Sequence, residues 1–181
     1  MNQLKPTLQS ITYIIMGELI QLAGAISDGW VSTLTIIFGI YLFFSGLSKL
    51  KSGLDTAGQS GVGWLIIASI VSVVGSLIDF IPLMGLFASL VYMIAFVLQI
   101  LGFIQLKKSK SIGEIGRGGV SLLFASMGLA ILGTLFGILP FVGGVMQGMV
   151  GFGALVCAVY GWLRIQEGLV DETIAIPNTI G

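Results

Sequence analysis

The chain has 181 residues, of which 56% are hydrophobic and only 9% are charged, and its formal net charge is zero. Soluble domains carry about 25% charged residues, so this composition excludes a soluble globular protein. The balanced charge also excludes a nucleic-acid partner, which requires a basic surface. The sequence has no histidine and a single cysteine, Cys157, which excludes an internal disulfide and most zinc, haem and triad chemistry.

Six apolar segments follow one another, each close to the roughly 20 residues that cross a bilayer as a helix. They are residues 7–27, 31–50, 62–80, 84–106, 119–139 and 142–165. The segments are apolar all round and do not alternate with a period of two, so they predict helices and not barrel strands. The first segment is interrupted by Glu18 and Gln21 and is too long for a signal peptide, so we interpret it as a retained membrane helix.

The cations all lie at one end of the predicted helices. They precede the first segment, follow the second and fourth, or end the sixth: Lys5, Lys49, Lys51, Lys107, Lys108, Lys110, Arg117 and Arg164. The short turns at the other end carry Asp28 and Asp79, which we interpret as solvated groups. Because cytoplasmic loops are enriched in Lys and Arg, this bias predicts that both termini and the two longer loops lie in the cytoplasm.

An internal repeat organises these segments. When the third segment is compared with the fifth at a shift of 58 residues, Gly61 aligns with Gly119. The same shift aligns Gly75 with Gly133, Ser76 with Thr134, and Pro82 with Pro140. The first segment follows the same plan with Gly17, although Asp28-Gly29 replaces the proline. The sequence therefore predicts an all-α polytopic membrane protein of three pseudo-repeated hairpins, residues 7–50, 62–106 and 119–165. These form one domain, 1–167, followed by a polar cytoplasmic tail, 168–181.

Glycines recur at equivalent places in the three predicted hairpins. In lipid there is little hydrophobic drive between helices, so helix association relies on close backbone contact at small residues. We expect such contacts at Gly17, Gly46, Gly75, Gly102, Gly133 and Gly161. The small residues Ala68, Ser72 and Ser76 fit the same kind of packing.

Several of these residues carry a family resemblance. Gly63-Trp64, an apolar stretch, Gly75 and then Pro82 resemble the HdeD-like acid-resistance membrane proteins, as do Gly39 and Gly46 placed before the basic exit of the second segment. The resemblance covers most of residues 30–165. It implies a six-helix bacterial inner-membrane protein linked to acid or envelope stress, with no catalytic residues to carry over.

Glu18 is the outstanding polar residue of the predicted spans, which otherwise contain Gln21, Gln99 and Gln147. An ionised carboxylate at mid-bilayer costs roughly 2.5–3.5 kcal/mol, and no Lys or Arg lies at its depth in the sequence, so we expect a neutral carboxyl at pH 7. Three interpretations remain open: a protonated Glu18 hydrogen-bonded within the bundle, a proton or cation site, or a contact with another subunit. We expect Gln99 and Gln147 to form hydrogen bonds between helices.

The repeat predicts one polar site within the membrane. It places Glu18, Ser76 and Thr134 directly after equivalent glycines, with Gln21 one turn away from Glu18. If the hairpins pack with approximate threefold symmetry, these side chains approach one another, and Glu18 donates to a hydroxyl of Ser76 or Thr134.

The sequence carries no Walker loop, dinucleotide fingerprint, CxxC motif or triad, so we predict no enzyme, no cofactor and no metal site. The first functional expectation is a structural or stress-related membrane protein. The first alternative is a proton or small-solute channel or transporter that uses Glu18, and the second is an accessory subunit of a larger membrane complex. The expected partners are the lipid bilayer and either further copies of the chain or that larger complex.

Overall fold

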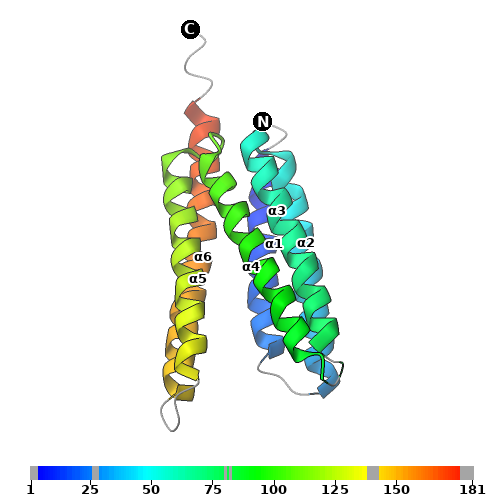
Figure 1. Ribbon diagram of the computed structural model, residues 1–181. Coiled ribbons are helices and arrows are strands. Elements are labelled where there is room, and N and C mark those ends of the chain that lie inside the picture. The colour runs from blue at the N-terminus through cyan, green and yellow to red at the C-terminus, as the bar shows by residue number, and fades with distance from the viewer. Residues whose placement is uncertain (1–3, 26–28, 80, 82, 138–142, 176–181) are drawn as a thin grey trace. The chain divides into compact units, whose positions relative to one another are not determined.

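The computed structural model describes residues 4–25, 29–79, 81, 83–137 and 143–175. In these residues the chain is all-helical (Figure 1). The helices are α1 (Leu4–Ala25), α2 (Gly29–Ser52), α3 (Thr56–Asp79), α4 (Gly85–Lys108), α5 (Gly113–Gly137) and α6 (Gly143–Ala175). The predicted turn residues Asp28, Pro82 and Pro140 lie outside the described residues.

Five of the described helices, α2 to α6, are long and apolar enough to cross a membrane. They also expose large apolar side chains along their length, among them Ile37, Ile70 and Phe152. Such side chains are unfavourable in water and are expected where a helix faces lipid. The chain is therefore a helical membrane protein, with five of the six predicted spans corresponding to helices of this kind.

The helices extend beyond the apolar segments at the ends that carry the basic residues. Helix α3 begins at Thr56 instead of residue 62, α5 begins at Gly113 instead of 119, and α6 continues to Ala175 instead of 165. Hydropathy marks only the part of a helix that lies in hydrocarbon, whereas the backbone hydrogen bonds of a helix continue into polar sequence. In α6 the extension is packed, since a Cβ on Gly168 would lie 2.7 Å from the backbone nitrogen of Gly116.

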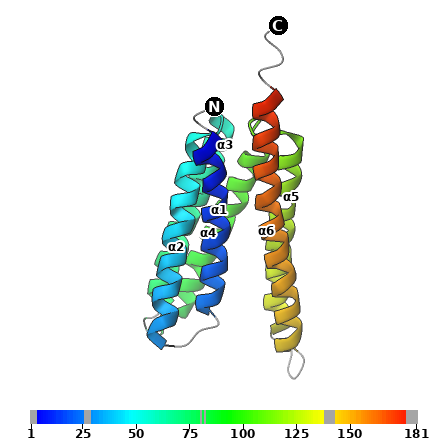
Figure 2. The same cartoon turned by 180° about the vertical axis from the view of Figure 1, so that it is seen from behind.

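The chain divides into two compact units, residues 1–110 with α1 to α4 and residues 111–181 with α5 and α6. Within them, consecutive helices pair as α1 with α2, α3 with α4, and α5 with α6, and α2 also packs on α3 (Figures 1 and 2). The first unit is thus two hairpins in contact through their middle helices. The second unit is a single hairpin.

Close backbone contact holds α3 to α4 and α5 to α6. A Cβ on Gly61 would lie 2.7 Å from the carbonyl oxygen of Gly102, and one on Gly102 would lie 3.0 Å from the oxygen of Gly61. In the other pair, a Cβ on Gly161 would lie 2.8 Å from the oxygen of Gly119. No side chain fits at these positions without a shift of the backbone, so the glycines permit the approach of the helices.

The contact between α1 and α2 uses a serine in place of one glycine. A Cβ on Gly46 would lie 2.6 Å from the oxygen of Ser10, which is fully buried. About two turns further along, a Cβ on Gly17 would lie 2.7 Å from the oxygen of Gly39. Helix α1 therefore approaches α2 closely at two levels.

The glycines Gly75 and Gly133 lie at looser contacts. A Cβ on Gly75 would lie 3.0 Å from Cε1 of Tyr92, and one on Gly133 would lie 3.6 Å from the oxygen of Gln147. The second distance is ordinary van der Waals contact, so an alanine fits at Gly133. In α3 to α6 the tightest packing thus lies in the halves of the hairpins next to the basic ends, whereas α1 and α2 are also in close contact further along, at Gly17 and Gly39. The large fully buried side chains gather in the same halves: Ile11, Ile14, Leu47, Leu50, Val62, Leu106, Val120, Trp162 and Ile165.

Asp55 fastens the connection between α2 and α3 to the end of α4. Its Oδ1 accepts hydrogen bonds from the backbone N–H of Gly58 (3.0 Å) and from the hydroxyl of the buried Ser109 (2.6 Å). Its Oδ2 accepts one from the backbone N–H of Lys110 (2.9 Å). Asp55 therefore caps the N-terminus of α3 and joins the two hairpins of the first unit at their basic end.

These contacts lower the pKa of Asp55. Partial burial of the carboxylate acts in the opposite direction, but the hydrogen bonds from Ser109, Lys110 and Gly58 and the positive charge of Lys110 outweigh it. A carboxyl whose pKa is lower in the folded state stabilises the fold above its unfolded pKa, and this contribution is lost as the pH falls through the folded pKa.

Replacing Gly61 with alanine is expected to destabilise the protein by about 1–3 kcal/mol, because the added methyl group overpacks the contact with α4. Gly128→Ala is the matched control, since no atom lies within 4 Å of a Cβ there, and it is expected to be neutral or to stabilise by up to about 1 kcal/mol. Thermal unfolding in detergent measures both variants. Equal unfolding temperatures for the two would contradict a backbone contact at Gly61.

Asp55→Ala is expected to cost about 0.5–2 kcal/mol at neutral pH through loss of the helix cap. The difference from wild type should shrink as the pH falls below about 4, because the wild-type carboxylate is then being protonated. Thermal unfolding of both proteins over a pH series measures this. A difference that stays constant to the most acid pH would show that the charge of Asp55 contributes nothing.

Candidate functional site

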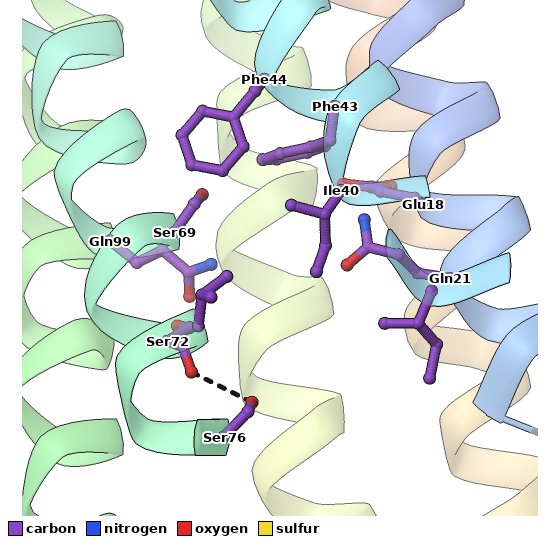
Figure 3. A pocket seen from close by; sticks show the side chains of 11 residues that line it. Glu18, Gln21, Ile40, Phe43, Phe44, Ser69, Ser72, Ser76 and Gln99 are labelled. Atoms are coloured by element: carbon purple, nitrogen blue, oxygen red, sulfur yellow. Dashed lines mark hydrogen bonds between the residues drawn. The ribbon is translucent and has the colours of Figure 1, made fainter. Parts of the chain in front are cut away.

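A cavity of about 300 Å³ lies within the first unit, among α1, α2, α3 and α4 (Figure 3). Its lining residues are Glu18, Gln21, Ile36, Ile40, Phe43, Phe44, Ser69, Ser72, Val73, Ser76 and Gln99. The side chains from α1, Glu18 and Gln21, face the serines of α3 and Gln99 of α4, and the apolar side chains of α2 form the wall between them. Most of the lining residues lie away from the ends of their helices. The cavity therefore places polar side chains at a depth where lipid hydrocarbon surrounds a membrane protein.

The close packing of α1 on α2 positions Glu18 and Gln21. Because neither Gly17 nor Gly39 has a side chain, α1 lies directly on α2, and the Cγ of Gln21 occupies the space over Gly39, 2.7 Å from where a Cβ would stand. Gln21 Nε2 donates to the carbonyl oxygen of Gly17 at 3.2 Å. The side chains of Glu18 and Gln21 therefore pass the flank of α2 and reach the cavity.

The serines of α3 form a stripe at helical spacing, Ser69, Ser72 and Ser76. Ser69 Oγ donates to the carbonyl oxygen of Leu65 (2.9 Å), and Ser76 Oγ donates to that of Ser72 (3.1 Å). These bonds stay within α3 and leave hydroxyl lone pairs directed away from the backbone. Ser76 Oγ also accepts a hydrogen bond from the hydroxyl of Tyr92 on α4 at 3.0 Å.

Glu18 supplies the one titratable side chain among the described lining residues. Its Oε2 is shielded from solvent, and the described lining contains no Lys or Arg. Ser76, which also lines the cavity, is exposed. The arrangement is suited to hold a proton, a cation or a small hydrogen-bonding solute.

The structure brings together three of the four residues of the predicted polar site, Glu18, Gln21 and Ser76. Thr134 lies in the second unit, where its hydroxyl donates to the carbonyl oxygen of Ala130 on its own helix at 3.0 Å. The sequence alone predicts only a hydrogen bond between helices for Gln99 and only helix packing for Ser72. The spacing of three and four residues between Ser69, Ser72 and Ser76 is the signal that identifies the stripe.

Among the described residues there is no group of three or more His, Cys, Asp and Glu side chains that would hold a metal ion. Comparison of the chain with protein-family models, with curated proteins and with solved structures gave no match. The chemistry of the site is therefore inferred from its own residues.

Ser72→Cys, made in a Cys157→Ser background, is expected to react with a small hydrophilic thiol reagent in lipid bilayers, because position 72 lines a polar cavity. Ile70→Cys is the control at similar depth, since Ile70 is exposed on the apolar surface of the same helix and a thiol there should remain unlabelled in lipid. The labelled fraction, measured by mass spectrometry, tests this. An unreactive thiol at position 72 would show that water does not reach the cavity.

Proposed function

We propose that this chain is a transport protein that binds a small polar solute or a proton in the cavity at Glu18 and passes it across the membrane. One observation carries the proposal: six polar side chains from three helices surround a single cavity, and one of them is a carboxyl. Ionisable residues within membrane helices are costly and mark solute and proton pathways. The sequence offered this role, a proton or small-solute channel or transporter that uses Glu18, as its first alternative. It is a role in binding and transfer and not in catalysis.

A purely structural role, the first functional expectation, accounts less well for the cavity. Polar groups that hold a bundle together bond across helices and fill the space between them. Here Ser69 and Ser76 donate to carbonyl oxygens of their own helix, Ser76 also accepts a hydrogen bond from Tyr92 of α4, and a volume of about 300 Å³ is left open beside them. A stress-related role, as the HdeD resemblance implies, remains compatible with transport because a carboxyl that binds protons responds to acid.

We place the protein in a bacterial inner membrane with both termini in the cytoplasm and α1 as a sixth span. Helix α1 has 22 residues, which gives roughly 33 Å of length, enough to cross the hydrocarbon core. It packs on α2, which is itself apolar enough to span. The last turn of α2 carries the exposed Lys49 and Lys51, and the last turn of α4 carries the exposed Lys107 and Lys108. Such basic residues are expected where a helix leaves the membrane on the cytoplasmic side.

The three hairpins are inferred to be copies of one unit. The supporting contacts are Gly61 with Gly102 and Gly119 with Gly161. In each pair the even-helix glycine also lies against a leucine one turn further on, Leu65 and Leu123 respectively. In the first hairpin Gly46 meets Ser10 and Ile14 in the same manner, so Ser10 takes the role of the odd-helix glycine there.

Proteoliposomes test the proposed function. With a membrane potential imposed and a pH-sensitive dye inside, wild-type protein is expected to carry protons, alone or when a transported solute is added outside. Glu18→Gln is expected to fold normally and to abolish the flux. The matched control is Thr134→Val, which removes the repeat-equivalent hydroxyl in the second unit and should leave the flux unchanged. A flux that is unaffected by Glu18→Gln, or equal to that of empty vesicles with every solute, would contradict the proposal.

A further inference from the structure

The hydrogen-bonding character of the cavity restricts what it binds. Ser69 and Ser76 use their hydroxyl hydrogens within α3, and Gln21 directs an amide N–H to its own helix. Ser69 and Ser76 therefore offer oxygen lone pairs to the cavity, Gln21 offers its amide oxygen and its second N–H, and the carboxyl of Glu18 adds lone pairs when ionised. The carboxylate and these two serines favour a ligand that donates hydrogen bonds, whereas Gln99 and Ser72 can both donate and accept.

Charge restricts the ligand further. An anion would meet the carboxylate of Glu18 without any Lys or Arg among the described lining residues. A neutral solute leaves the carboxyl of Glu18 protonated, because a carboxylate without a positive charge beside it in a cavity of low dielectric is costly. A cation compensates that charge, so the occupied site is neutral.

The apolar wall and the size of the cavity separate organic cations from metal ions. Phe43 of α2 lies beside Glu18, and Phe44 lies towards Ser69 of α3 (Figure 3); aromatic side chains attract ammonium groups. A volume of about 300 Å³ is at the lower end of the range for small-molecule sites. A single metal ion would fill little of it and would leave the apolar wall without a partner.

We propose that the ligand of this cavity is a small organic monocation, an ammonium compound with one apolar group, that binds in exchange for the proton of Glu18. This inference rests on the proposed function and names its substrate class. The ammonium group lies between Glu18 and the ring of Phe43 and donates to the oxygens of Gln21 and the serines, and the apolar group lies against Phe44. One proton leaves the carboxyl for each monocation that enters, so the net charge of the cavity is unchanged.

The surrounding groups leave Glu18 as the residue that exchanges the proton. The described lining from α2 is apolar, that from α3 is serine and valine, and that from α4 is Gln99. The hydroxyl of Tyr92 on α4 donates a hydrogen bond to Ser76 Oγ. The ammonium group of Lys49 lies over the ring of Tyr13 on α1, 4.1 Å from its centroid. The Lys49 side chain is therefore held at the basic end of α2, and it is not one of the residues that line the cavity.

Three probes of nearly equal size test the inference on the full-length protein in lipid nanodiscs by calorimetry. They are benzylamine, which is a cation at neutral pH, benzyl alcohol, which is neutral, and benzoate, which is an anion. Benzylamine is expected to bind about tenfold or more tightly than the other two, as loss of one charge-assisted hydrogen bond predicts. Glu18→Gln should remove that preference, Thr134→Val should not, and binding in weak buffer should release one proton per benzylamine.

The outcomes separate this inference from the proposed function. If all three probes bind alike and Glu18→Gln changes nothing, the cation inference is wrong while solute binding in the cavity stands. If no probe binds and none carries a Glu18-dependent flux, both are wrong. Should Glu18→Gln not fold, Phe43→Leu gives the second test: it is expected to weaken benzylamine more than benzyl alcohol, and an equal effect on both would overturn the inference.

Discussion

Backbone contact between the two helices of each hairpin is the interaction on which the rest of this structure depends. In a bilayer, lipid tails compete with apolar side chains for the surface of a helix, so tight association requires positions without side chains. Gly61 with Gly102 and Gly119 with Gly161 provide such positions. The hairpin is consequently the unit of packing, and the large fully buried side chains gather at the basic ends of the helices.

Tight packing within hairpins leaves looser packing between them, and this is where the cavity forms. In the first unit the two hairpins meet through α2 and α3 and are joined at the basic end by Asp55. The same glycines that bring α1 onto α2 direct Glu18 and Gln21 past α2 towards the serines of α3. Small residues on the contact faces of the helices therefore both permit the close packing and direct the polar side chains into the cavity.

The helices and the polar residues were predictable from the sequence because hydropathy and isolated polar side chains are local signals. The helix ends were less predictable, since α5 and α6 continue into polar sequence where Gly168 packs on Gly116. The grouping of Glu18, Gln21 and Ser76 was predicted from the repeat, but the repeat could not show that Thr134 belongs to another unit. Which hairpins share a cavity depends on packing between hairpins, which no local pattern encodes.

Infrared spectroscopy of Glu18 in lipid bilayers tests the central claim, that its carboxyl lies in a cavity open to exchange and not in a sealed bundle. The signal of Glu18 is isolated as the difference between wild type and Glu18→Gln. The account predicts a protonated carboxyl band that shifts promptly in D₂O and is replaced by a carboxylate band when a small ammonium ion is added. A carboxyl band that is insensitive to both D₂O and the cation would contradict it, and would assign Glu18 to a purely structural hydrogen bond.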